Sequence, residues 1–82
     1  IYPQVLKNVR VTDKTQAQND ADVRAMVERA AKELGTDGRI LVRESGTEPL
    51  VRVMVEAGNV ETCEKYVDAV IDVIRSKGYV IE

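Results

Sequence analysis

The segment with the most chemical potential runs from residue 43 to residue 52 and reads R-E-S-G-T-E-P-L-V-R. Arg43 and Arg52 bound it, and Ser45, Gly46 and Thr47 lie between them. A guanidinium group is a planar fork of hydrogen-bond donors that suits phosphate. Two hydroxyls and consecutive backbone N–H groups can converge on one anion, and glycine tolerates the positive φ that such an anion-binding nest uses. These residue types at this spacing predict a site for a doubly charged anion such as phosphate.

Two carboxylates in the same segment argue against this interpretation, because they would repel a phosphate group. Glu44 should point to the face of its strand opposite Arg43, since side chains alternate along a strand. Glu48 belongs to the tip of the loop, where it can turn outward or hold an arginine in place. A Glu48 carboxylate between the two guanidinium groups would neutralise them and weaken the prediction. The plain alternative is that both arginines are solvated surface side chains.

The residues on either side of the loop can be paired as an antiparallel hairpin. If the hairpin is symmetric about the loop, Arg43 lies directly opposite Arg52. Like charges in that position destabilise a sheet by a few tenths of a kcal/mol up to about 1 kcal/mol. The other pairs all suit a sheet: Ile40 with Val55 and Val42 with Val53 on one face, and Leu41 with Met54 and Arg39 with Glu56 on the other. A bound dianion would compensate for the one unfavourable pair.

Hydrophobic periodicity predicts the elements that position this hairpin. Residues 4–11 are rich in valine and partly alternate, which is typical of a strand, whereas the polar residues 12–18 are expected to form a loop. Asn19 or Asp20 can cap a helix that Gly35 ends. The first half of the chain therefore reads as a strand, a loop and a helix.

The second half of the chain predicts the rest of the sheet. Strands are expected over residues 39–44 and 50–57, a second helix between Asn59 and Gly78, and a short last strand over residues 79–81. The resulting β-α-β-β-α-β order predicts an α+β fold. We expect a four-stranded, mainly antiparallel sheet with two helices packed on one face.

Several reactive or apolar residues have plain structural interpretations. Cys63 lies on the apolar stripe of the second helix and is expected to be a buried, inert thiol. Leu41 and Met54 should form a small apolar patch on the sheet face away from the helices, which another domain would cover. The acids of the second helix are expected to form a solvated face rather than a metal site: Glu61, Glu64, Asp68 and Asp72.

Composition narrows the classes of function. The 82 residues allow one domain, and the formal charge of −2 gives no overall attraction to nucleic acid or anionic membranes. The absence of histidine excludes a histidine general base and a histidine-based zinc site. A single cysteine excludes an internal disulfide and favours a reducing, cytoplasmic setting. The chain begins on I-Y-P-Q without methionine, which indicates a domain cut from a larger protein.

The loop and the start of the chain resemble a known family. R-E-S-G-T-E-P-L-V-R followed by V-M-V-E-A is similar to the phosphate-binding loop of the α-D-phosphohexomutase superfamily. The opening Y-P-Q-V-L-K-N-V-R-V resembles the start of the last domain in its bacterial phosphoglucosamine mutase branch. The resemblance spans essentially the whole chain. It implies that residues 1–82 are a single domain, the C-terminal phosphate-binding domain of a larger four-domain cytoplasmic enzyme.

The resemblance also implies a function. Enzymes of that branch interconvert glucosamine 6-phosphate and glucosamine 1-phosphate through a 1,6-bisphosphorylated sugar, on the route to peptidoglycan precursors. Arg43, Ser45, Gly46, Thr47 and Arg52 fall on the positions that hold the non-transferred phosphate of the substrate. The catalytic phosphoserine and the Mg²⁺ ligands belong to the other three domains, so this domain is expected to hold no catalytic residue and no metal, and to be inactive alone. The implied partners are the phosphosugar and the other three domains, with no nucleic acid and no membrane.

Three alternatives stay open beside this interpretation. The domain could belong to a phosphoglucomutase or phosphomannomutase of the same superfamily. It could be a free-standing module that binds RNA, although that mode uses aromatic side chains on the strands, and this chain has no Phe or Trp. It could also be a regulatory ligand-binding or oligomerisation domain of the same shape.

Overall fold

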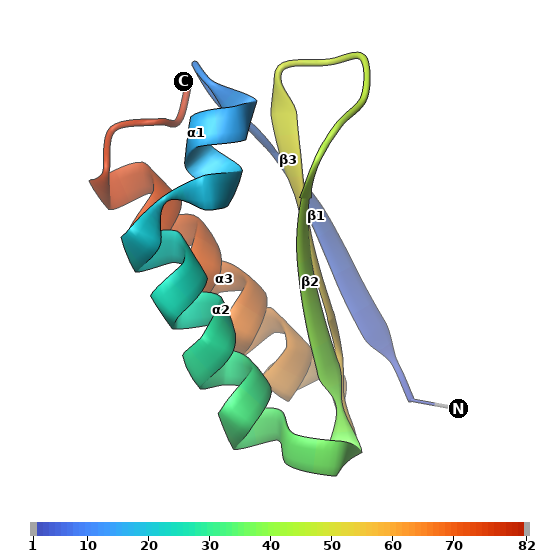
Figure 1. Ribbon diagram of the computed structural model, residues 1–82. Coiled ribbons are helices and arrows are strands. Elements are labelled where there is room, and N and C mark those ends of the chain that lie inside the picture. Colours follow the sequence, from blue (N-terminus) through green and yellow to red (C-terminus); the bar gives the residue numbers. More distant parts are fainter. Residues whose placement is uncertain (1, 82) are drawn as a thin grey trace.

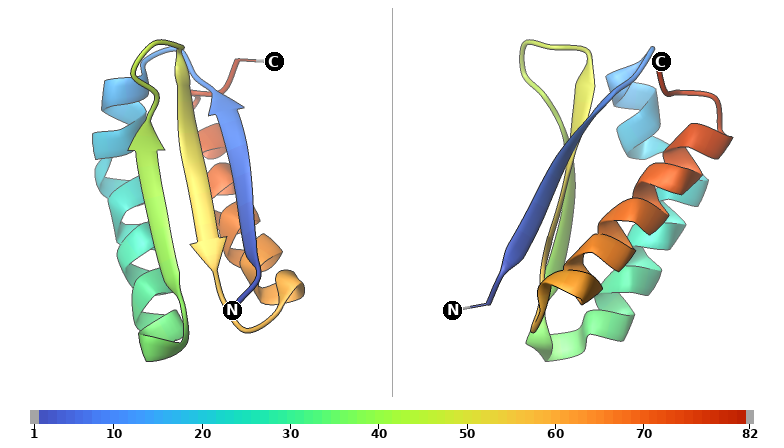
Figure 2. Two further views of the ribbon diagram at one scale, coloured as in Figure 1. Left: turned by 90° about the vertical axis from the view of Figure 1, so that its right-hand side faces the viewer. Right: turned by 180° about the vertical axis from the view of Figure 1, so that it is seen from behind.

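The strands form one antiparallel sheet in the order β1-β3-β2, so β3 is the central strand (Figure 2). The computed structural model describes residues 2–81. Within them β1 spans Gln4–Arg10, β2 spans Arg39–Glu44 and β3 spans Leu50–Glu56. The hairpin register predicted from the sequence is confirmed pair by pair, from Arg39 opposite Glu56 to Arg43 opposite Arg52.

The helices all lie on one face of this sheet (Figure 1). They are α1 (Lys14–Asn19), α2 (Ala21–Leu34), the short 3₁₀ helix η1 (Gly35–Asp37) and α3 (Val60–Ser76). The N-caps follow the chemistry of the sequence, since the Asp20 carboxylate accepts from the N–H of Val23 and the Asn59 side chain accepts from the N–H of Thr62. None of the helices in residues 2–81 has both the length and the apolar character that crossing a membrane requires.

The core lies between the helices and the inner face of β3. Val51, Val53 and Val55 have no exposed surface, because alternate residues of the central strand face the helical layer. Burying one such side chain contributes about 1.5–3 kcal/mol to folding. Cys63 is fully buried in the same cluster, and its thiol donates to the carbonyl oxygen of Pro3 at 3.4 Å, as expected for a structural cysteine.

The predicted four-stranded sheet with two helices is wrong, because residues 79–81 do not form a strand. They contact the sheet region through a single bridge between Val11 and Val80. Gly78 has φ of 83° and turns the chain after α3, just before this bridge. The partner residue Val11 lies just beyond the end of β1, where the chain turns toward α1, so the bridge does not extend into a ladder along β1.

The polar segment 12–18 was predicted as a loop, but most of it forms α1. Asp13 is the N-cap, and its carboxylate accepts from the N–H of Gln16 at 3.0 Å. Ala17 is fully buried beneath the helix. Six residues are too few for a hydrophobic period to be visible, and such a helix is stable only through tertiary contacts. The pair Asp13 and Gln16, an acid followed three residues later by a glutamine, was the available N-terminal signal.

Candidate anion-binding site

The two arginines of the hairpin lie on the sheet face that the helices leave open. Arg43 on β2 is directly opposite Arg52 on β3, and both side chains are exposed. Neither guanidinium forms an ion pair with any described residue. By contrast, Arg39, which lies four residues before Arg43 on β2, forms an ion pair with Glu56, with Nε 3.8 Å from Oε1. The two arginines therefore present two uncompensated positive charges to the same side.

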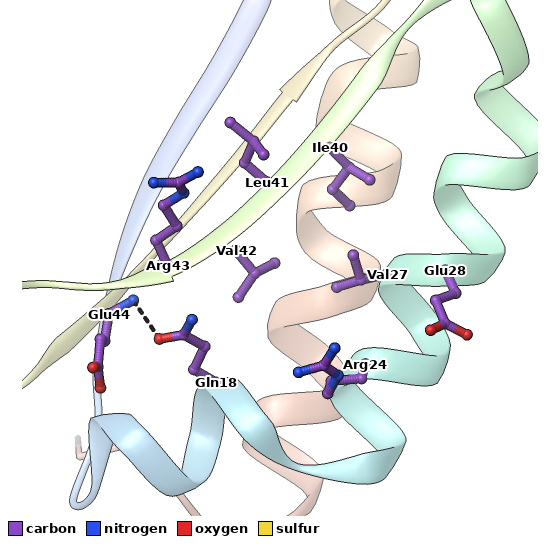
Figure 3. Close-up of a pocket in the computed structure, with 9 residues that line it drawn as sticks. All are labelled: Gln18, Arg24, Val27, Glu28, Ile40, Leu41, Val42, Arg43 and Glu44. Atoms are coloured by element: carbon purple, nitrogen blue, oxygen red, sulfur yellow. Dashed lines mark hydrogen bonds between the residues drawn. The ribbon is translucent and has the colours of Figure 1, made fainter.

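The carboxylates of the loop segment do not neutralise these charges. Glu44 lies on the opposite side of β2, where its carboxylate accepts from the Thr15 hydroxyl at 2.8 Å and its backbone N–H donates to the Gln18 side chain at 3.0 Å (Figure 3). This confirms the orientation predicted from strand alternation. Glu48 is exposed and forms no ion pair with a residue of the described chain.

Ser45 organises the loop from within. Its side chain is largely buried, and its Oγ accepts from the N–H of Thr47 at 3.4 Å and from the N–H of Glu48 at 3.3 Å. Its own N–H donates to the carbonyl oxygen of Leu50 at 2.9 Å, which closes the base of the loop. A hydroxyl has two lone pairs and one proton, so only the proton of Ser45 is left for a further partner. Toward a ligand, this side chain is therefore a donor, as an anion requires.

Gly46 and Thr47 form the exposed tip of the loop. Among residues 2–81, neither the N–H of Gly46 nor the hydroxyl of Thr47 has a hydrogen-bond partner. Gly46 does not use the positive φ that glycine tolerates, because the described glycines with positive φ are Gly35 and Gly78. A Cβ on Gly46 would meet no atom within 4 Å. Neither backbone geometry nor internal packing requires glycine here, and without a side chain the N–H of Gly46 is accessible.

Strand β1 adds residues that sequence reasoning missed. Asn8 lies opposite Arg52 on β3, and Arg10 lies two residues further along the same open face, opposite Leu50. Arg10 also forms no ion pair in the described chain. This pairing joins residues about forty positions apart, for which a single sequence carries no register signal. The structure thus gathers Arg10, Arg43 and Arg52 at one end of one face, although the formal net charge is −2.

Two further hydrogen bonds connect the loop to residues of the same chain outside the hairpin. The N–H of Val11 donates to the carbonyl oxygen of Pro49 at 2.9 Å. The Lys14 ammonium donates to the carbonyl oxygen of Ser45 at 2.6 Å, and this contact is partly buried. Both ties come from the segment that was predicted as strand end and loop, so the sequence did not indicate them.

A cleft of about 580 Å³ lies between the free edge of β2 and helix α2, and Arg43 is one of its lining residues. Figure 3 shows Ile40 and Val42 on the side of β2 that faces Val27, with Arg43 on the other side. Ser45, Gly46 and Thr47 do not line this cleft. The donors that could hold an anion converge at the loop, so we assign the candidate site to the loop and the open sheet face.

The described residues do not fit a divalent metal. Among residues 2–81, no group of three or more His, Cys, Asp or Glu side chains is placed to hold an ion. The acids of α3 are partly engaged elsewhere, since Asp68 accepts from Lys7 at 2.7 Å.

Known proteins are similar to this chain in sequence and in fold. Phosphoglucosamine mutase of Lachnospira eligens is 80% identical over 81 residues, covering 99% of this chain and 18% of that protein. Phosphoglucosamine mutase of Bacillus subtilis is 53% identical over 76 residues, covering 93% of this chain and 17% of that protein. The chain thus spans less than a fifth of the length of these relatives.

Solved structures of related mutases have a similar fold. N-acetylphosphoglucosamine mutase of Aspergillus fumigatus, in complex with glucose 1,6-bisphosphate, has a TM-score of 0.80 over 96% of this chain and 16% of that one, and its identity of 24% shows the fold alone. N-acetylglucosamine-phosphate mutase in its substrate complex has a TM-score of 0.73 and 27% identity, over 89% of this chain and 15% of that one. The profile of the family "Phosphoglucomutase/phosphomannomutase, C-terminal domain" matches residues 6–73, and the chain belongs to this family.

Proposed function

We propose that residues 1–82 are the C-terminal domain of a phosphoglucosamine mutase and hold the phosphate of the phosphosugar that is not being transferred. The observation that carries the proposal is the pair Arg43 and Arg52, which lie opposite each other on one face without a carboxylate partner. Two like charges in register cost free energy. A phosphate dianion between them converts that cost into a binding contribution.

The free donors of the loop complete the proposed site. The N–H of Gly46, the hydroxyl of Thr47 and the remaining proton of Ser45 are all hydrogen-bond donors without an acceptor in the described chain. Charge-assisted hydrogen bonds contribute about 1.5–3 kcal/mol each. The site reads a phosphate group and makes no contact that requires a particular sugar, so either end of a bisphosphorylated sugar fits it.

The proposed role is positioning rather than proton transfer. In the reaction proposed for the parent enzyme, glucosamine 6-phosphate becomes glucosamine 1-phosphate through a 1,6-bisphosphorylated sugar that turns around between two phosphoryl transfers. Holding the non-reacting phosphate in one place fixes the reacting one against the catalytic group, which lowers the entropic part of the barrier. The relative solved with its substrate supports a phosphosugar ligand class.

The proposal assigns the remaining chemistry to the rest of a four-domain enzyme. The phosphorylated serine and the Mg²⁺ ion would lie there, so this domain alone would bind the phosphate weakly and catalyse nothing. The short share of each relative that the chain covers supports this division. We place the parent enzyme in the cytoplasm, where it would supply amino-sugar phosphate for peptidoglycan precursors, and the buried free thiol of Cys63 fits that reducing compartment.

Titration with inorganic phosphate, followed by backbone amide NMR of the 82-residue chain, tests the proposal. The expected result is a set of shifts confined to residues 43–52 and their neighbours on β1. Arg52→Gln should abolish these shifts. Arg24→Gln is the matched control, because Arg24 is an exposed arginine of α2 without an ion pair in the described chain. Shifts that survive Arg52→Gln, or that fall equally in Arg24→Gln, would contradict the proposal.

A further inference from the structure

We infer that helix α1 braces the anion-binding loop, and that Lys14 is the positioning residue that aims the backbone N–H of Gly46 at the bound anion. The inference rests on the proposed function, because it takes the ligand of this loop to be a phosphate. Three hydrogen bonds from α1 and the geometry of the Ser45–Gly46 peptide group support it.

Three polar side chains of α1 converge on the two residues at which β2 passes into the loop. The ammonium of Lys14 donates to the carbonyl oxygen of Ser45 at 2.6 Å. The hydroxyl of Thr15 donates to the Glu44 carboxylate at 2.8 Å, and the side-chain oxygen of Gln18 accepts from the N–H of Glu44 at 3.0 Å. Lys14 and Gln18 are four residues apart, so they lie on the same side of the helix.

Other contacts fix α1 itself. Ala17 is fully buried, Asp13 caps the first turn, and Val11 just before the helix donates to the carbonyl oxygen of Pro49 at the far side of the loop. The segment 11–18 thus touches the loop at both of its stems. A six-residue helix with no long apolar face has little stability of its own, so these contacts account for its position.

The planarity of the peptide bond links Lys14 to the binding site. The carbonyl of Ser45 and the N–H of Gly46 belong to the same peptide group, and in a trans peptide they point in opposite directions. Lys14 holds the carbonyl oxygen toward α1. The N–H of Gly46 must therefore point away from α1, and it is a donor with no partner in the described chain.

The peptide needs this restraint because Gly46 is one of its two residues. Glycine allows most backbone conformations at little cost, so the Ser45–Gly46 peptide can rotate unless a contact holds it. A rotated peptide would present the carbonyl oxygen to the anion in place of the N–H, which exchanges a donor for a repulsive dipole. A partly buried ammonium at 2.6 Å is a strong restraint, because hydrogen bonds with a charged partner are stronger than neutral ones.

The decisive variant is Lys14→Met, which keeps the aliphatic stem and removes the donor. Phosphate affinity of the 82-residue chain should fall about tenfold, the effect of losing one charge-assisted hydrogen bond. The phosphate-induced shift of the Gly46 amide should shrink more than that of any other loop residue. Lys14→Arg should restore most of both, since a guanidinium keeps the charge and a donor.

Two controls separate positioning from charge and from folding. Lys32→Met removes an exposed lysine of α2 and should leave phosphate affinity unchanged. If Lys14→Met fails to fold, Thr15→Val loosens the same helix from Glu44 without touching the loop and should weaken phosphate binding by a smaller factor. In the full-length enzyme, Lys14→Met should raise KM and lower kcat, because a phosphate that is held less firmly also leaves the reacting phosphate less well positioned.

The outcomes distinguish this inference from the proposed function. If Arg52→Gln leaves phosphate binding intact, the proposed function is wrong. If Arg52→Gln abolishes binding while Lys14→Met changes neither the affinity nor the Gly46 response, the loop binds phosphate but Lys14 does not aim it. A Lys14→Met protein that loses affinity and is not rescued by Lys14→Arg would also overturn the role of the Ser45 hydrogen bond.

Discussion

At the scale of single residues, Gly46 is the position where the fold and the proposed ligand make different demands. Its backbone lacks a positive φ, and a Cβ there would meet no atom within 4 Å. The folded domain would therefore accept alanine. A phosphate approaching the N–H would meet the added methyl group.

Gly46→Ala should accordingly separate stability from binding. Replacing a glycine whose conformation alanine can adopt stabilises a protein by about 0.4–1 kcal/mol, so the free energy of unfolding should stay level or rise. Phosphate affinity should fall. Gly58→Ala is the matched control. A Cβ at Gly58 also meets nothing within 4 Å, and Gly58 lies at the end of β3 away from the anion-binding loop. Denaturant unfolding and phosphate titration of both variants measure the two effects, and a loss of stability in Gly46→Ala would show a structural need for glycine.

Arg52 offers the complementary test. Arg52→Ala removes a repulsion worth a few tenths of a kcal/mol up to about 1 kcal/mol, so the thermal stability of the chain should stay level or improve slightly. In the full-length enzyme the same change should lower kcat/KM at least tenfold, because a charge-assisted hydrogen bond to phosphate is lost. Thermal melts and steady-state kinetics check the two parts. A marked fall in Tm would mean that Arg52 supports the sheet.

At the scale of elements, the start of α2 is joined to the chain that follows α3. The Tyr79 hydroxyl donates to the Asp20 carboxylate at 2.7 Å, and the Lys77 ammonium donates to the Asp22 carboxylate at 2.9 Å. Asp20 is also the N-cap of α2, so one carboxylate serves the helix and the tyrosine together. The hydrogen bond from Tyr79 holds the pKa of Asp20 below its ordinary value of 3.8. The same bond raises the pKa of Tyr79 above 10.0.

These two shifts predict how stability depends on pH. The lowered pKa of Asp20 adds stability that is complete above pH 3.8 and is lost as the pH falls through the folded-state pKa. The raised pKa of Tyr79 adds stability that is complete below pH 10.0 and is lost as the pH rises through the folded-state value.

Tyr79→Phe should lower Tm by a few degrees at neutral pH and reduce the dependence of Tm on pH at both ends, because the shared hydrogen bond is gone. Melting curves across the pH range measure this. An unchanged alkaline limb in Tyr79→Phe would show that another group titrates there.

The elements also show which information the sequence carried. Alternation of β-branched residues set the register of β2 and β3 correctly, because a slip of one residue would expose Val53 and Val55. Helix α1 was missed because its contacts to Glu44 and Ser45 are tertiary and leave no periodic pattern. The place of Arg10 was missed for the same reason, since it depends on the long-range pairing of β1 with β3.

At the scale of the whole molecule, the sheet has one covered face and one open face. Leu6, Met54 and Leu41 lie in one row across β1, β3 and β2 on the open face. Leu6 is 56% exposed and Leu41 is 37% exposed, which confirms the apolar patch predicted on the side away from the helices. The chain spans 18% of its Lachnospira relative. In a protein of that length, the part outside this chain is large enough to cover this apolar row.

Leu41→Ser should therefore act differently in the two contexts. In the 82-residue chain Leu41 is 37% exposed, so the change should lower the free energy of unfolding by about 1–2 kcal/mol, the share of leucine burial that this domain supplies. In the proposed full-length enzyme, burial of the rest of that side chain against another domain would make the same change lower the melting temperature further. Calorimetry of both proteins compares the effects, and equal shifts would show that this row stays in water.

The pairing of Arg43 with Arg52 has a consequence for stoichiometry. Backbone hydrogen bonds hold neighbouring strands about 4.8 Å apart, so the roots of the two side chains keep a fixed separation. In the proposed site, side chains that start this close together can both reach the oxygens of one phosphate group. If the proposed function is right, a sugar with a phosphate at each end would be held by one phosphate at a time, and exchanging the two ends would require release of the bound phosphate.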